Sequence, residues 1–148
     1  MSTSFDLFTS AFMHKARAYN IVSEDTQIAT EMLDEYLKVS LSRFNKYCEY
    51  DLSDINDELR EINTDINKKD LEEIIDIVSE GMVVSWLQPF VNNSDNLFNV
   101  LNTTDYSQYA PHNVAKANKE LYESARTHFK KLRKNYTYDH GDLTNLHI

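Results

Sequence analysis

Glycine and proline, the residues that turn a chain most sharply, occur only twice each in the 148 residues of this sequence. A β-sheet protein of this length needs many tight turns, and glycine and proline are concentrated in turns. Apolar residues instead recur every three or four positions between Glu, Lys, Asp and Asn, which is the spacing of one helix face. We therefore predict an all-α chain whose length suffices for one domain with a buried core.

Four segments have the apolar periodicity of a helix, and three of them are long. The predicted helices cover residues 5–19, 25–49, 71–90 and 112–135. Ser23, Glu24 and Asp25 form a capping sequence for the second helix, and Pro111 suits the first turn of the last one. We expect a helical bundle of three main helices plus shorter ones.

The two segments between the long helices are rich in cap-forming residues. Residues 50–69 carry five apolar residues three or four apart among many Asp and Asn, so the segment is either partly helical or a structured connector. Residues 91–111 are predicted to be a loop with one helical turn at 95–101, capped by Ser94. We therefore predict that both segments connect the long helices.

The helix predicted over 71–90 is the most apolar and should lie at the centre of the bundle. Asp70 and Glu73 suit a capping box at its start. Gly81 costs about 1 kcal/mol relative to Ala inside a helix, which indicates a close helix–helix crossing there. Pro89 should kink or end the helix. The expected core packs Ile75, Val78, Met82 and Trp86 against Leu37, Leu41 and Leu121.

Charge is distributed unevenly along the chain, whose net charge is −9. Residues 112–148 hold seven Lys and Arg against four Asp and Glu, a net charge of +3, which leaves −12 for residues 1–111. Such a chain repels nucleic acid over most of its surface. It can attach to its own copies or to a charged partner, although a basic, solvated helix face explains the same residues.

No residue pattern in the sequence predicts a catalytic, cofactor or metal site. Asp51, Asp54 and Asp57 lack the alternate spacing and the glycine of a calcium-binding loop. The five histidines show no HxH or HxxxH spacing, and two glycines cannot build a phosphate-binding loop. Cys48, the single cysteine, has acidic neighbours that disfavour a thiolate, so we expect a half-buried structural residue. An enzyme and a bound cofactor are therefore not expected.

The end of the chain carries the candidate partner-binding residues. Arg126, Lys130 and Lys134 recur every fourth residue and form one cationic ridge on the last helix. Residues 137–148 lack a helical period and are expected to be an extended arm, separate from a helical domain over 1–136, that orders against a neighbouring chain. The predicted partner-binding residues are Arg126, Lys130, Lys131, Arg133, Lys134, Tyr138, Leu143, Leu146 and Ile148.

Several stretches have a familiar order: SRFNKY (42–47), DLSDINDELREINTDI (51–66), MVVSWLQPFVNNSDNL (82–97), DYSQYAPHNVAKANKELYESARTHFKKL (105–132) and NYTY (135–138). This order resembles small virion proteins of tailed bacteriophages that infect Gram-positive bacteria, of the head–tail connector or neck type. The resemblance covers about residues 30–138. The sequence departs from the pattern where two lysines intervene before the central helix.

The resemblance implies an adaptor whose copies form an oligomeric ring between the portal and the tail-side neck proteins. It implies a location in the virion neck after synthesis in the host cytoplasm, with DNA present only in the lumen and no membrane partner. The absence of an 18-residue apolar run and of a secretory signal agrees with that location. Two alternatives stay open: a tail completion or terminator protein, and a small helical regulator that binds nucleic acid through residues 126–136.

Overall fold

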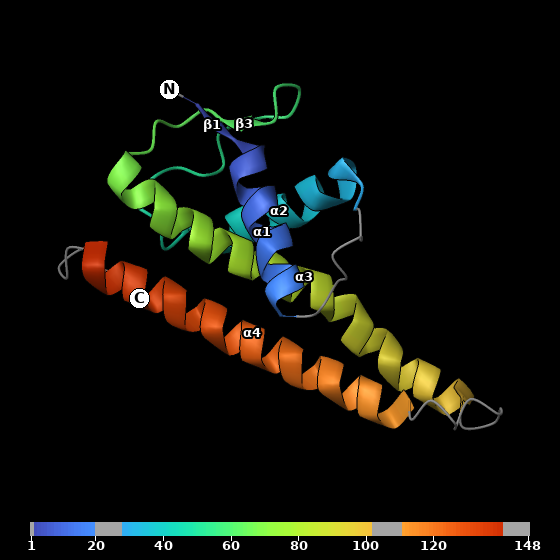
Figure 1. Cartoon of the computed structure of the whole chain (residues 1–148). Helices are drawn as coiled ribbons and strands as arrows, with labels where there is room; N and C mark the ends of the chain where they lie inside the picture. The colour runs from blue at the N-terminus through green and yellow to red at the C-terminus, as the bar shows by residue number, and fades with distance from the viewer. Residues whose placement is uncertain (1, 20–27, 102–110, 141–148) are drawn as a thin grey trace.

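The computed structural model describes the backbone of residues 2–19, 28–101 and 111–140, and the side chains of 2–19, 28–89 and 119–139. The chain is mostly helical, as predicted. Its elements, in order, are β1 (Thr3–Ser4), α1 (Phe5–Ala18), α2 (Thr30–Asn45), β2 (Ile55–Asn56), β3 (Glu61–Ile62), α3 (Lys68–Leu101) and α4 (Pro111–His140). In Figure 1, α3 runs through the middle, with α4 along one side and α1, α2 and the small sheet on the other.

Helix α1 matches the predicted bounds closely. Ser4 caps it, because its hydroxyl accepts a hydrogen bond from the backbone N–H of Asp6 at 3.2 Å. Phe5, Phe8 and Phe12 are buried along one face, as their spacing predicts. This aromatic face anchors α1 to the rest of the core.

Helix α2 is shorter than predicted and begins without a side-chain cap. Its N-cap residue is Ala29, which has no hydroxyl or carboxylate to accept a hydrogen bond from the first turn. The predicted cap at Ser23–Asp25 lies outside the described residues. Leu33, Leu37 and Leu41 are buried at the predicted spacing, so the apolar stripe of α2 is confirmed.

Gly81 lies at a close crossing of α2, α3 and α4, as its position in an apolar helix predicted. A Cβ atom at this residue would lie 2.1 Å from Oγ of Ser40 on α2 and 2.8 Å from Cζ of Phe129 on α4. Oγ of Ser40 donates a hydrogen bond of 2.6 Å to the buried carbonyl of Val78. The three helix backbones approach one another because residue 81 has no side chain.

The segment between α2 and α3 contains two strands, which the all-α prediction did not include. Strands β1, β3 and β2 form a three-stranded antiparallel sheet, in which Ile62 pairs with both Thr3 and Ile55. Leu52, Ile62 and Ile66 are buried, whereas Leu59 is exposed. These apolar residues have a helix-like spacing, but they anchor a β-hairpin and the segments on either side of it.

Helix α3 starts earlier and ends later than predicted. Asn67 accepts a hydrogen bond from the N–H of Lys69 at 3.2 Å and caps the helix, so the capping box at Asp70 and Glu73 was wrong. The carboxylate of Asp70 instead accepts a 2.6 Å bond from the hydroxyl of Tyr50. Pro89 was expected to kink or end the helix. The helix continues through Pro89 to Leu101, so it does not end there, and the loop predicted from residue 91 was wrong as far as residue 101.

Packing explains why Pro89 does not terminate α3. A proline removes one backbone hydrogen bond and costs about 3 kcal/mol in a helix. Val83, Val84 and Leu87, in the turns that precede it, are buried in the core. Helix α4 runs alongside α3 (Figure 1). The tertiary contacts of the long helix therefore outweigh the loss of one hydrogen bond.

Helix α4 begins at Pro111, as predicted, and ends at His140, five residues later than predicted. The first four residues of the expected C-terminal arm are thus helical. Tyr138 is on this helical extension and is 62% exposed. The remaining arm residues, including Leu143, Leu146 and Ile148, lie outside the described residues.

The predicted core is correct at its centre and wrong at its edges. Val78, Met82, Leu37 and Leu41 are buried, as expected, whereas Ile75, Trp86 and Leu121 are only partly buried. Trp86 packs edge-on against the rings of Phe12 at 6.2 Å and Tyr36 at 5.8 Å between centroids. The tryptophan therefore lies where α1 and α2 meet α3, at the border of the core.

Candidate interaction surface

A cationic groove lies between α2, α3 and α4, and it includes part of the ridge predicted from sequence. Its volume is about 430 Å³, and the residues that line it are Arg43, Val84, Gln88, Tyr122, Arg126, Phe129, Lys130 and Arg133. We call this site the basic groove. Four of its eight residues are cations and none is acidic, while three are apolar or aromatic. The groove therefore combines positive charge with an apolar floor.

The apolar floor of the basic groove is rigid, because its residues belong to the core. Val84 and Phe129 are each 3% exposed. Tyr122 packs on the core at the edge of the groove and is half-buried. A ligand in the groove would meet fixed side chains below and flexible cations around the rim.

Arg133 differs from the other predicted partner-binding cations because its side chain is packed into the protein. Its guanidinium lies 4.5 Å from the ring centre of Phe129 and 4.9 Å from that of Tyr47. One terminal nitrogen donates to the carbonyl of Arg43 at 3.4 Å, and Nε is buried with no hydrogen-bond partner among the described residues. Burial lowers the pKa of Arg133. We infer that Arg133 forms the wall of the groove rather than a mobile surface charge.

The remaining predicted cations are exposed on α4. Arg126, Lys130, Lys131 and Lys134 are all exposed. Within the described part of the chain, no ion pair joins any of them to a carboxylate. Arg126 and Lys130 line the basic groove, whereas Lys131 lines a shallower hollow with Glu123. The structure thus places Arg126 and Lys130 on the groove side of α4 and Lys131 on its outer side.

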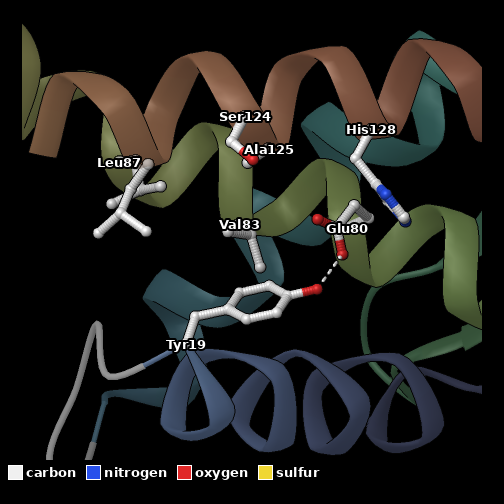
Figure 2. Close-up of a pocket in the computed structure, with 8 residues that line it drawn as sticks. Tyr19, Glu80, Val83, Leu87, Ser124, Ala125 and His128 are labelled. Carbon is white, nitrogen blue, oxygen red and sulfur yellow. Dashed lines mark hydrogen bonds between the residues drawn. The ribbon is translucent and has the colours of Figure 1, made fainter. Parts of the chain in front are cut away.

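A second cavity, of about 240 Å³, lies between α1, α3 and α4 (Figure 2). Glu80 forms its floor and is 1% exposed. Its carboxylate accepts hydrogen bonds from Nζ of Lys15 at 3.0 Å and from the hydroxyl of Tyr19 at 3.1 Å. His128 extends from α4 toward the same cavity (Figure 2). This site could not be predicted from the sequence, because its residues come from three separate helices.

The geometry of this second cavity favours a structural role. A buried carboxylate is stable only when it is paired and hydrogen-bonded, and Lys15 and Tyr19 supply both. Burial alone would lower the pKa of Lys15, but its bonds to Asp76 and Glu80 outweigh that effect and raise it. His128 makes no hydrogen bond to Glu80 in the described structure. The bonds of Lys15 and Tyr19 to Glu80 therefore hold α1 against α3. Among the residues that line the cavity, no nucleophile is activated by a base in the described structure.

Cys48 is half-buried, as predicted. Its thiol donates a weak hydrogen bond to the hydroxyl of Tyr136 at 3.6 Å. Burial raises the pKa of the Cys48 thiol, and burial also raises the pKa of Tyr136. Both groups therefore stay protonated near neutral pH, where a thiol is a poor nucleophile.

The acidic aspartates considered for calcium binding belong to the exposed connector. Asp51 accepts hydrogen bonds from the backbone N–H and the hydroxyl of Ser53, and Asp57 pairs with Lys38. No cluster of three or more potential metal ligands occurs among the residues that the structure describes.

No described helix has an apolar stretch long enough to cross a membrane.

The hairpin formed by β2 and β3 is a surface feature that sequence reasoning missed. Leu59 at its tip is 65% exposed, the largest exposed fraction among the exposed large apolar side chains of the described residues. Arg60 adopts φ = 53° and donates hydrogen bonds to both carboxylate oxygens of Asp34, at 2.7 and 2.8 Å, and to Asp6 at 2.8 Å. The bonds to Asp34 raise the pKa of Arg60. An apolar residue is thus presented at a fixed position on an acidic surface.

Comparisons with models of protein families, with curated proteins and with solved structures found no match for this chain.

Proposed function

We propose that this chain is a structural virion protein, a head–tail connector whose copies form an oligomeric ring between the portal and the tail. The order of the motifs at 42–66, 82–97 and 105–138 supports this proposal through its resemblance to neck proteins of tailed bacteriophages. In this account the protein is not an enzyme and needs no cofactor. Its partners are its own copies, the portal protein and tail-side neck proteins.

The observation that carries the proposal is the unpaired positive charge on α4 of an otherwise acidic chain. Four exposed cations, Arg126, Lys130, Lys131 and Lys134, have no carboxylate partner among the described residues. The rest of the chain, residues 1–111, has a net charge of −12. Proteins with separated charges of this kind bind partners through complementary surfaces and are oriented by them.

A nucleic-acid regulator is the second candidate function, and one observation favours it. Arg126, Lys130 and Lys134 lie on one line along α4 and are exposed, so they could contact successive phosphates. The net charge of the chain opposes this reading, because −9 repels a polyanion over most of the surface. Binding to a duplex oligonucleotide, measured over a range of salt concentrations, separates the two functions.

The proposal is tested by removing the gene from the phage that carries it. We expect the mutant to produce DNA-filled heads and separate tails that fail to join, and we expect the chain to be found in purified wild-type particles by mass spectrometry. Complementation with the wild-type gene should restore complete particles. Complete, infectious particles formed without the gene, or purified particles that lack the chain, would contradict the proposal.

A further inference from the structure

The hairpin and the basic groove have opposite charge, and each contains an apolar part. The connector segment 51–65 carries six Asp and Glu residues against one Arg. Its tip, residues 56–60, joins β2 to β3 and presents Leu59 to solvent. The basic groove offers four cations around an apolar floor formed by Val84, Tyr122 and Phe129.

The hairpin tip is held in one conformation. Leu59 donates its backbone N–H to Oδ1 of Asn56 at 3.1 Å. Two hydrogen bonds from its guanidinium to Asp34 keep Arg60 at positive φ. Residues with a Cβ atom rarely adopt this backbone conformation. A tip that is already ordered loses little entropy when it binds, so it is suited to be an anchor.

We propose that the hairpin tip of one copy docks into the basic groove of a second copy. Leu59 packs on the apolar floor beside Val84 and Tyr122. Glu58, which is exposed and has no ion pair among the described residues, then lies near Arg126 and Lys130 at the rim. Each partner supplies what the other lacks: an apolar side chain with negative charge, and an apolar pocket with positive charge.

A small anion or a phosphate backbone fits the groove less well. Such a ligand would use the cations but would leave the apolar floor without an apolar contact. The hairpin tip carries the exposed Leu59 next to the exposed Glu58, and therefore uses both features. A second copy is also present wherever the first is made.

The contact has to join two molecules, because the tip and α4 lie on opposite sides of α3 (Figure 1). A contact between two different surfaces of the same chain is head-to-tail, and its repetition gives a closed ring or a filament. A contact between copies deepens the proposed function. It rests on that function in one respect only, the closure of the contact into a ring at the neck. The contact itself can be tested with the purified full-length chain.

The experiment measures self-association by light scattering at low and high salt for two charge reversals, Glu58→Lys at the tip and Arg126→Glu at the groove. Matched controls reverse the same charges at exposed sites elsewhere, Glu35→Lys on α2 and Lys119→Glu on α4. All variants are first checked for unchanged thermal melting. A mixture of the two test variants is then measured.

We expect the wild type to associate more strongly at low salt, because less salt screens the charges less. Each test variant should associate at least about tenfold more weakly, while the controls should behave like the wild type. An equimolar mixture of the two test variants should associate more strongly than either variant alone, since the intact tip of Arg126→Glu can dock into the intact groove of Glu58→Lys. Replacing Leu59 by Ser should weaken association with no change in net charge.

Three results would overturn the inference: a wild type that is monomeric at every concentration and salt level, test variants that associate like the controls, or a mixture that stays monomeric. Loss of oligonucleotide binding in Arg126→Glu with unchanged self-association would also overturn it, in favour of a nucleic-acid groove. Loss of the contact would leave the neck assignment standing, because the gene deletion and the mass spectrometry of purified particles test that assignment without reference to this contact.

Discussion

Replacing Gly81 by Ala tests the packing of the three helices that build the basic groove. The new Cβ would lie 2.1 Å from Oγ of Ser40 and 2.8 Å from Cζ of Phe129. Carbon atoms in contact are normally about 3.5–4.0 Å apart, so both neighbours have to move. The hydroxyl of Ser40 cannot move without weakening its 2.6 Å bond to the carbonyl of Val78.

Three terms set the magnitude of this effect. Overpacking a core costs about 1–3 kcal/mol, and leaving a buried polar group without a partner costs about 1–3 kcal/mol more. Alanine gains about 1 kcal/mol over glycine in helix propensity. The net expectation is a loss of about 3 kcal/mol, which lowers the melting temperature of a chain of this size by about 6–12 °C.

The assay is urea denaturation followed by circular dichroism, with a double-mutant cycle. Ser40→Ala removes the atom nearest to the new Cβ, so Gly81→Ala should cost at least about 1 kcal/mol less in that background. If Gly81→Ala is as stable as the wild type, or if the two substitutions are additive, the close crossing described here is wrong. If helix propensity alone decided the stability of the variant, Gly81→Ala would be about 1 kcal/mol more stable than the wild type.

The remaining predictions concern the second cavity, the cysteine and the end of the chain. The pKa of Lys15 is raised above 10.5 in the folded protein, so its contribution to stability is present below that pH and is lost as pH rises through the folded value. Stability should therefore fall as pH rises above about 10.5, and less steeply when Lys15→Met and Glu80→Gln are combined, as urea denaturation at each pH will show. Iodoacetamide should alkylate Cys48 at least about tenfold more slowly than a model thiol at neutral pH, and more slowly still in Tyr136→Phe, because the hydrogen bond of Tyr136 lowers the pKa of the thiol; a rate equal to that of the model thiol would refute the burial of Cys48. Deleting residues 141–148 should abolish assembly without changing the melting temperature, and a truncated chain that still forms complete particles would exclude the C-terminal arm.

The helices of this protein could be predicted from sequence because their signals are local. The spacing of Phe5, Phe8 and Phe12 defines one face of α1, and Pro111 marks the first residue of α4. Gly81 indicated a helix crossing because a glycine in an apolar helix usually has a packing reason. In each case neighbouring residues contain the whole signal.

The features that sequence reasoning missed depend on residues that are far apart in the chain. Strand β3 pairs with β1, which precedes it by about sixty residues, and no local pattern of period two announces strands of two residues. Arg60 holds the hairpin through Asp34 on α2. Pro89 stays within α3 because of tertiary packing, which overrides its local preference.

The candidate site was predicted in part, for the same reason. Arg126 and Lys130 were found because their spacing on one helix is regular. Arg43 joins the groove from α2 and Val84 from α3, and neither position has a sequence signal that links it to α4. Arg133 belongs to the regular basic run but is packed against aromatic rings, which only the folded structure reveals.

Electron microscopy of purified particles with this chain labelled tests the central claim most directly. A tag on the N-terminus, decorated with a gold-conjugated antibody, reports where the chain lies in the particle. We predict label at the junction between head and tail, in particles whose neck is intact. Label on the capsid shell or the distal tail, or particles without label although the tagged chain is made in the infected cell, would contradict the assignment of this chain to a head–tail connector.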